Sequence, residues 1–256
     1  MNILVCVKQV ANPELQYRIR DDALDIVRDN LTFQVNGPDE YALEEAVRLR
    51  EAHGGKVTAI AAGPTRATEV LRQAMAKGAD EAVRIDMPDG REFDPAYTGR
   101  ALAQAIQDME FDLVLCGVQS DDYAHGATGP ILASHLGIPH ASVVTKVEVE
   151  GERVRVSREL EGGLEEQVIL PLPALLTMQF GINEPRFASV AAILRATRQT
   201  IQERTVASME DTPGLTVRRM YIPEVTHQAE MLEGSGDEVA QKLAAILREK
   251  GLVPEA

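Results

Sequence analysis

Apolar and polar residues alternate over roughly the first half of the chain in the way expected of repeated β-α units. Apolar runs of strand length occur at residues 2–10, 57–62, 82–85 and 113–116. The segments between them repeat apolar residues at the spacing of one helical face, at residues 38–50, 67–75 and 95–109. Strands that alternate with helices usually pair in parallel. We therefore predict a Rossmann-like α/β fold, an open and mainly parallel sheet with helices on both faces.

Beyond Gly137 the pattern changes to short segments in which apolar residues alternate with charged ones. These segments are residues 143–149, 153–158 and 166–170. Such alternation is typical of antiparallel strands with one solvent-exposed face, and Glu161-Gly-Gly163 supplies a turn between two of them. We predict an antiparallel hairpin extension of the sheet. A buried strand at residues 173–177 and a helix at about residues 187–195 follow it.

The C-terminal segment has little regular pattern before its last helix. Residues 198–228 show no sustained period, and a connection of that length is typical of a linker or an arm. Residues 237–250 form an amphipathic helix whose apolar face needs a surface to pack on. We expect an α/β domain at residues 1–197, which includes the hairpin extension, and a C-terminal arm and helix at residues 198–256.

The composition narrows the classes of function. The 40 Asp and Glu residues outnumber the 26 Lys and Arg residues, so the formal net charge of −14 argues against binding to nucleic acid or to an anionic membrane. No apolar run approaches the ~18 residues of a membrane span, and the first residues enter a strand without a charged leader. We expect a cytoplasmic protein that is not embedded in a membrane.

Sequence motifs for catalysis or metal binding are absent. Cys6 and Cys116 both lie within apolar runs, which favours inert packing thiols over nucleophiles. His125, His135 and His140 lack the spacing of metal ligands. We predict no catalytic residue and no metal, so a cofactor or a partner would have to supply any chemistry.

The loop after residues 113–116 is the strongest candidate for a ligand site, because ligands of open parallel sheets bind beyond the carboxyl ends of strands. It ends in Gly126-Ala-Thr-Gly129 and leads into a helix predicted at residues 131–136. Small residues let backbone N–H groups at a helix start approach an anion such as an adenylate phosphate, and Thr128 adds a donor. An ordinary well-capped loop has the same pattern, and the sequence matches neither phosphate-binding fingerprint.

Two further features affect this hypothesis. Asp121 and Asp122 in the same loop would repel a phosphate at contact distance, so we expect them to accept hydrogen bonds from ribose hydroxyls or from loop N–H groups. Asn36-Gly-Pro-Asp39 opens the first long helix and either offers more N-terminal donors or is a capping turn.

The segment from Gly181 to Val190 carries an unusual set of apolar residues in a loop. Ile182, Phe187 and Val190 form a small apolar surface beside Arg186, which gives it a charged rim, and this combination could dock on a partner. Asn183 and Pro185, in contrast, are residues that initiate helices, so an ordinary loop before a helix explains the pattern as well.

Several segments together resemble the beta subunit of electron transfer flavoprotein, over nearly the whole chain. The most specific one is residues 156–177, with its Glu161-Gly-Gly163 turn and its Pro-x-aliphatic-aliphatic-Thr ending. Residues 183–189 are similar to the dehydrogenase recognition loop of that family. Residues 3–10 and 40–46 resemble its N-terminus and its first helix.

This resemblance implies a heterodimer in which the alpha subunit binds most of a redox-active FAD. The beta subunit would form a wall of that site, hold an adenine nucleotide, commonly AMP, and pack its C-terminal arm and helix on the alpha subunit. Electrons would pass from flavin dehydrogenases, such as acyl-CoA dehydrogenase, through the FAD to a quinone oxidoreductase or another acceptor. The beta subunit would thus be part of an electron carrier and not an enzyme.

The resemblance also assigns residues by position. The expected nucleotide-binding residues are Cys6, Asn36, Asp39, Ala62, Gly117, Gln119, Ser120, Asp121, Asp122, Gly126, Ala127, Thr128 and Gly129. The expected docking residues are Ile182, Asn183, Glu184, Pro185, Arg186, Phe187 and Val190, with Val190 as an apolar plug that enters a dehydrogenase pocket.

The identity of the nucleotide and two other classes of protein remain alternatives. The loop at residues 121–129 matches neither the AMP-type pattern nor that of electron-bifurcating members, which bind a second FAD. We expect AMP, because Tyr123 and His125 add bulk where the pyrophosphate of FAD would extend. A stand-alone nucleotide-binding stress-type regulator would have no use for the hairpin or the arm. A dinucleotide-dependent dehydrogenase would need a GxGxxG turn after the first strand, and this chain lacks one there.

Overall fold

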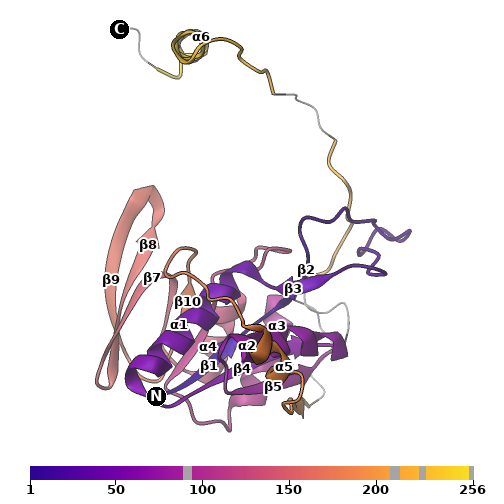
Figure 1. Cartoon of the computed structure of the whole chain (residues 1–256), viewed down its shortest axis with the longest axis vertical. Helices are drawn as coiled ribbons and strands as arrows, with labels where there is room; N and C mark the ends of the chain where they lie inside the picture. The colour runs from indigo at the N-terminus through magenta and orange to yellow at the C-terminus, as the bar shows by residue number, and fades with distance from the viewer. Residues whose placement is uncertain (89–93, 208–213, 225–228, 254–256) are drawn as a thin grey trace. The chain divides into compact units, whose positions relative to one another are not determined.

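The computed structural model describes residues 1–88, 94–207, 214–224 and 229–253 (Figure 1). The chain divides into two compact units, Met1–Arg219 and Met220–Ala256. The first unit contains a sheet flanked by helices, and the second contains helix α6 (Gly236–Glu249).

The first unit is built on one large sheet, which confirms the predicted fold class. Its strands within the described residues are β1 (Asn2–Cys6), β4 (Lys56–Gly63), β5 (Glu81–Asp86), β6 (Leu113–Gly117), β7 (His140–Glu150), β8 (Arg153–Leu160), β9 (Leu164–Pro171), β10 (Ala174–Met178) and β11 (Gln202–Thr205). Their order in the sheet is β11-β5-β4-β1-β6-β10-β7-β8-β9. Neighbours from β11 to β7 run parallel, and β8 and β9 continue the sheet antiparallel.

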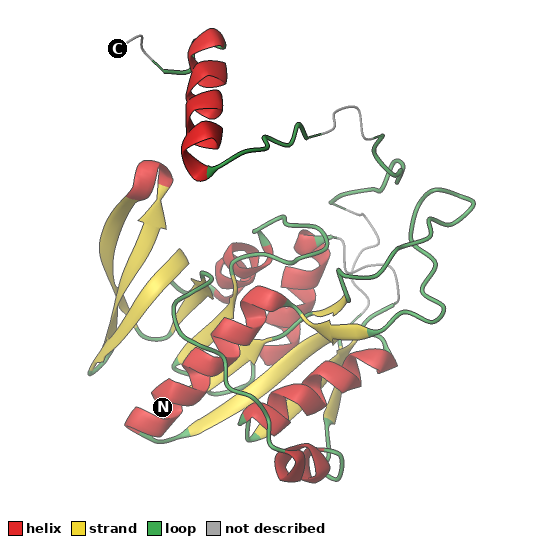
Figure 2. Cartoon of the chain, turned by 45° about the horizontal axis from the view of Figure 1, so that its top comes forward, coloured by secondary structure: helices red, strands yellow, loops and turns green. Residues whose placement is uncertain are grey.

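Helices cover both faces of this sheet (Figure 2). One face carries α1 (Gly37–His53), α2 (Thr68–Lys77) and α5 (Val190–Ala196), and the other carries α3 (Pro95–Ile106) and α4 (Thr128–Leu136). Successive side chains of a strand point to opposite faces. Accordingly, Ile3 and Val5 of β1 join the core beneath α1 and α2, whereas Leu4 joins the core beneath α3 and α4. The continuous apolar runs in the sequence therefore reflect strands that are buried on both faces.

The antiparallel extension is attached to the rest of the sheet through β10. This strand pairs in parallel with β6 on one side and with β7 on the other. The extension ends in a tight turn between β8 and β9, the short 3₁₀ turn η2 (Glu161–Gly163). Gly162 and Gly163 have φ of +77° and +74°, a left-handed conformation that glycine adopts without a steric penalty. The Glu-Gly-Gly sequence is explained by this backbone requirement.

The predicted first strand at residues 2–10 was wrong in its extent. After β1 the chain leaves the sheet, and Gln9–Ala11 forms β2, which pairs antiparallel with β3 (Phe33–Val35) in a separate two-stranded ribbon. The backbone N–H of Lys8 donates to the carboxylate of Asp39 instead of to a neighbouring strand. Side-chain hydrogen bonding thus ends a strand that the apolar pattern alone would have continued.

The segment at residues 198–228, predicted to lack regular structure, contains β11. This strand pairs with β5 at the edge of the sheet, and its four residues are polar, which is why no apolar period marks it. Arg84 of β5 is 4% exposed and forms an ion pair with Glu203 of β11 at 3.1 Å. Its guanidinium also donates to the carbonyl of Gly63 at 3.0 Å.

The second unit contains one amphipathic helix within its described residues. Helix α6 begins with a capping box, in which Ser235 caps the backbone N–H of Glu238 and the Glu238 carboxylate accepts from the N–H of Ser235. None of its side chains is buried. Within the described ranges, every helix of the chain is too short or too polar to cross a lipid bilayer.

Candidate functional site

The carboxyl ends of β1 and β6 meet where the strand order of the sheet reverses. From β1 the chain proceeds outward to β4 and β5, and then returns across the sheet to β6 on the other side of β1. In open parallel sheets, ligands bind in the crevice at such a switch point. A pocket lies there and is lined by the ends of these strands, by the start of α1, by α3 and by the loop that precedes α4.

The pocket brings together most of the residues expected to bind a nucleotide. These are Cys6, Asn36, Asp39, Ala62, Gly117, Gln119, Ser120, Gly126, Ala127, Thr128 and Gly129. Asp121 and Asp122 belong to the same loop but do not line the pocket. Residues from four distant parts of the sequence therefore converge because parallel strands end at the same edge.

Two glycines allow the close packing at the pocket floor. A Cβ atom on Gly117 would lie 2.5 Å from the Cβ of Pro38 and 2.6 Å from an oxygen of Asp39. A Cβ atom on Gly129 would lie 2.6 Å from Thr177 and 2.9 Å from the sulfur of Cys116. Any side chain at these positions would push α1 or α4 away from the strand ends.

Asp39 ties the ends of β1 and β6 together. Its carboxylate accepts from the backbone N–H of Lys8 at 2.7 Å and from that of Gly117 at 2.8 Å. Burial raises the pKa of Asp39 to about 7, although these hydrogen bonds act in the opposite direction. The carboxyl group is therefore poised to change protonation near neutral pH.

The two cysteines of the pocket are inert packing groups in this environment. Burial, together with the charge of Asp39, raises the pKa of Cys6 to about 12. Burial also raises the pKa of Cys116 well above its ordinary value. Since the thiolate is the reactive form of cysteine, neither group is activated as a nucleophile.

The two loop aspartates connect the loop before α4 to the start of α1 and to Lys8. Asp121 accepts from the backbone N–H of Gly37 at 2.8 Å, at the start of α1. Asp122 forms an ion pair with Lys8 at 2.6 Å. The Lys8 ammonium lies 4.8 Å from the centre of the Tyr123 ring, which stacks on His125. Asp121 thus accepts from the first N–H of a helix and not from a loop N–H group as expected, whereas Asp122 does accept from a loop N–H, that of Tyr123 at 2.8 Å.

The pocket retains polar groups that fit an anionic nucleotide. Helix α4 begins at Thr128, three residues before the predicted start at residue 131, and no side chain caps its first N–H groups. The buried hydroxyl of Thr98, a residue that lines the pocket, has no hydrogen-bond partner among the described residues. These groups could bind a phosphate and a further polar atom of a ligand.

Sequence reasoning missed Lys8 and Thr98 as pocket residues. Lys8 is the first charged residue within the apolar run at residues 2–10 and lies two residues after β1 ends at Cys6, so this charge was a usable signal of a strand end. Thr98 lies on α3, one helical turn before Leu102, which also lines the pocket. A polar residue on an otherwise apolar helical face was the available signal for Thr98.

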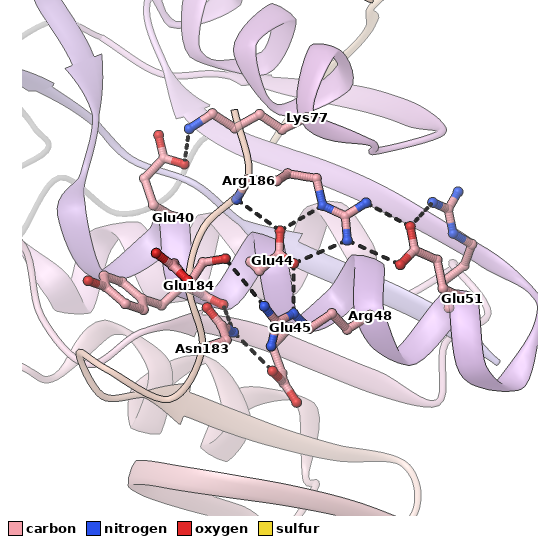
Figure 3. Close-up of polar contacts among 11 residues, drawn as sticks. Glu40, Glu44, Glu45, Arg48, Glu51, Lys77, Asn183, Glu184 and Arg186 are labelled. Atoms are coloured by element: carbon pink, nitrogen blue, oxygen red, sulfur yellow. Dashed lines mark hydrogen bonds and ion pairs between the residues drawn. The ribbon is translucent and has the colours of Figure 1, made fainter. Parts of the chain in front are cut away.

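A second surface is formed by the loop at residues 179–189, which runs along the outside of α1 (Figure 3). Its beginning contacts the start of the helix, where Phe180 packs edge-on against Tyr41 with ring centres 5.5 Å apart. Asn183 then donates to the carbonyl of Tyr41 at 3.0 Å and to Glu45 at 2.9 Å. Arg48 donates to the carbonyl of Glu184 at 3.3 Å.

The expected docking residues divide into buried anchors and exposed apolar groups. Asn183, Pro185 and Arg186 are half-buried, and Ile182 packs against the core instead of projecting from the loop as expected. Phe187 is 97% exposed and Val190 is 75% exposed. Helix α5 begins at Val190 with Ser189 as its N-cap, three residues after its predicted start.

Within the described residues, no cluster of His, Cys, Asp or Glu has the arrangement of a metal site. The fold is that of a doubly wound α/β domain with a pocket at the switch point of its sheet, where domains of this class bind ligands.

An electron transfer flavoprotein domain model matches residues 23–209 of the chain. The chain is 40% identical to the electron transfer flavoprotein subunit beta of Methylophilus methylotrophus, with 97% of this chain and 98% of that protein aligned. It is 34% identical to the corresponding subunit of Bacillus subtilis (99% and 100% aligned) and 33% identical to that of Sus scrofa (99% of both). The chain belongs to the electron transfer flavoprotein family.

Proposed function

We propose that this chain is the beta subunit of a heterodimeric electron transfer flavoprotein. Its partner is an alpha subunit that holds most of a redox-active FAD, and this chain forms part of the FAD site. The full-length similarity to proteins named as beta subunits is the observation that carries the proposal. Helix α6 is amphipathic and buries none of its side chains. This observation supports the proposal that the C-terminal arm and helix pack on the alpha subunit.

The pocket at the switch point holds a structural adenine nucleotide, AMP. The uncapped start of α4 takes the phosphate, and the Gly117 to Gly129 loop lies close enough for backbone contacts. Tyr123 and His125 line the pocket. Their bulk stands where a second FAD would extend its pyrophosphate. AMP is therefore preferred over the second FAD of electron-bifurcating relatives.

Co-expression with an alpha subunit and acid extraction of the purified heterodimer tests both parts of this proposal. One FAD and one AMP per heterodimer are expected. Two flavins without AMP would replace the AMP assignment by the bifurcating type. A stable homodimer that binds nucleotide but no alpha subunit would favour a stand-alone stress-type regulator instead.

The chain acts in electron transfer by binding and docking and not by catalysis. Flavin dehydrogenases such as acyl-CoA dehydrogenase dock at the exposed Phe187 and Val190, and electrons leave to a quinone oxidoreductase or another acceptor. The exposure of these two side chains beside the anchored loop supports this docking site.

Val190→Ala tests the docking site. It should slow electron transfer from the dehydrogenase several-fold, because an apolar anchor is lost, while the FAD content of the heterodimer stays the same. Unchanged kinetics of the variant would remove Val190 from the proposed interface.

A further inference from the structure

Arg186 is held by two carboxylates of α1, those of Glu44 and Glu51 (Figure 3). Its guanidinium donates to Glu44 from Nε at 2.8 Å and from Nη2 at 3.1 Å. The same guanidinium donates to Glu51 from Nη1 at 2.7 Å and from Nη2 at 3.1 Å. The backbone N–H of Arg186 also donates to Glu44 at 3.2 Å. Both the side chain and the main chain of this loop residue are therefore fixed to one helix.

Glu44 is the buried centre of this cluster. Only 4% of it is exposed, and it also accepts from Arg48 at 2.7 Å. Two guanidinium groups thus compensate a carboxylate that has little contact with water, which is the condition for a strong and directional ion pair. Burial of Glu44 alone would raise its pKa, but the hydrogen bonds from Arg186 and Arg48 outweigh burial and lower it.

The cluster lies directly before the exposed apolar residues. Phe187 follows Arg186 in the sequence, and Val190 begins α5 three residues later. The guanidinium of Arg186 is occupied by Glu44 and Glu51, so it has little capacity to bind an acidic group of a partner. Its geometry fits a role inside the protein better than a contact with another protein.

We propose that the cluster of Glu44, Glu51 and Arg186 sets the shape of the docking loop, so that Arg186 is a positioning residue for Phe187 and Val190. This inference rests on the proposed docking function of those two side chains. A loop that already has its docked shape binds without a cost of ordering. If loosening leaves about a tenth of the molecules in that shape, the apparent affinity for the partner falls ~10-fold.

Glu44→Gln distinguishes positioning from contact, because it removes a carboxylate while leaving Arg186 in the chain with its charge. The positioning role predicts a ~10-fold higher KM for an acyl-CoA dehydrogenase used as electron donor, with kcat changed less than about two-fold. A direct contact by Arg186 predicts the opposite, since its guanidinium would become more available to the dehydrogenase. A KM that stays the same or falls in this variant would overturn the proposal.

Arg186→Lys supplies a second test that keeps the positive charge. One ammonium group cannot bridge two carboxylates in the forked geometry of a guanidinium. We therefore expect Arg186→Lys to raise KM nearly as much as Arg186→Ala. Full activity of the lysine variant would show that charge alone is sufficient and would contradict the positioning role.

The matched control is Glu40→Gln on the same helix. The carboxylate of Glu40 pairs with Lys77 of α2 and not with the loop at residues 179–189. This variant should leave KM and loop order unchanged. An equal rise of KM in Glu40→Gln would assign the effect to α1 as a whole and overturn the role of the cluster.

Hydrogen exchange of the heterodimer measures loop order without any dehydrogenase. In Arg186→Ala, backbone amides of residues 182–189 should exchange ~10-fold faster, while those of β10 keep their rates. Unchanged exchange in the loop would refute the positioning role.

The outcomes also separate this inference from the docking function on which it depends. If Val190→Ala and Phe187→Ala raise KM but Glu44→Gln does not, the positioning role fails and the docking site stands. If none of the three raises KM, the docking site fails as well.

Discussion

The nucleotide pocket and the docking loop are built by different parts of the polypeptide. The pocket is shaped by main-chain groups and small residues, and close packing depends on Gly117 at the end of β6 and on Gly129 in the first turn of α4. The docking loop is held by charged side chains on α1, which lie more than 130 positions earlier in the chain. The pocket should therefore be sensitive to added bulk, and the loop should be sensitive to lost charge.

The largest effect is expected from Gly117→Ala. The new methyl group would overlap with Pro38 and Asp39, so the start of α1 must move. We expect the free energy of unfolding to fall by about 3 kcal/mol and nucleotide binding to weaken more than ~10-fold. Differential scanning calorimetry and nucleotide content of the purified heterodimer measure both quantities.

Gly236→Ala is a matched control for this substitution, because nothing lies within 4 Å of a Cβ atom built there. It should leave stability and nucleotide content unchanged. Equal losses in the two variants would show that close packing at Gly117 is not the reason.

A second prediction concerns the pH dependence of the pocket. The pKa of Asp39 is raised by burial from 3.8 in the unfolded chain to about 7, so the folded protein binds an extra proton between these pH values. The free energy of unfolding should therefore decrease as pH rises from about 4 to about 7. Measured between pH 5 and pH 8, the expected loss is roughly 3 kcal/mol. Asp39→Asn should flatten this dependence in chemical denaturation at the two pH values. An equally steep dependence in the variant would assign it to other groups.

The docking loop should depend on pH in the opposite sense. Hydrogen bonds from Arg186 lower the pKa of Glu51, and those from Arg186 and Arg48 lower that of Glu44 against its burial. The stabilisation is present above the ordinary glutamate pKa and is lost as pH falls through the lowered values. This contribution to the stability of the loop is about 1 kcal/mol, because Glu51 is half exposed and water screens its ion pair with Arg186. Exchange rates of loop amides, corrected for intrinsic rates, should rise only in acid. A rise toward neutral pH would contradict this explanation.

The smallest effect is expected from the ion pair that Lys8, a pocket residue, forms with Asp122. The ion pair of Lys8 and Asp122 is partly exposed, with side-chain exposures of 23% and 30%. Lys8→Met should therefore change the free energy of unfolding by less than about 1 kcal/mol. Arg20→Met removes a more exposed pair with Asp22 and serves as the reference. A loss of several kcal/mol in Lys8→Met would mean that the lysine supports the pocket in another way.

The sequence predicted the sheet and the position of the pocket because both follow from local patterns. Helical and strand periods report which side chains face a core, and strand ends report where a ligand can bind. The predicted pocket residues converge for that reason, even though they come from β1, α1, β4 and the loop after β6.

The features that were missed depend on partners far away in the chain. Strand β11 has polar residues, and its place at the sheet edge depends on pairing with β5 and on Arg84. Arg186 was expected at the rim of a docking surface, and no local pattern could indicate that Glu44 and Glu51 enclose it. Pairing of this kind is decided by tertiary packing and not by spacing along the chain.

The position of β10 also has a consequence for biosynthesis. The ribosome makes β6 and β7 well before β10, yet β10 separates them in the finished sheet. A nascent chain that ends before residue 174 therefore has two unjoined halves, each with an open edge that can pair with another chain. Strands β7 to β9 can pair with one another before β10 is made. The two halves of the sheet join only after β10 has emerged from the ribosome.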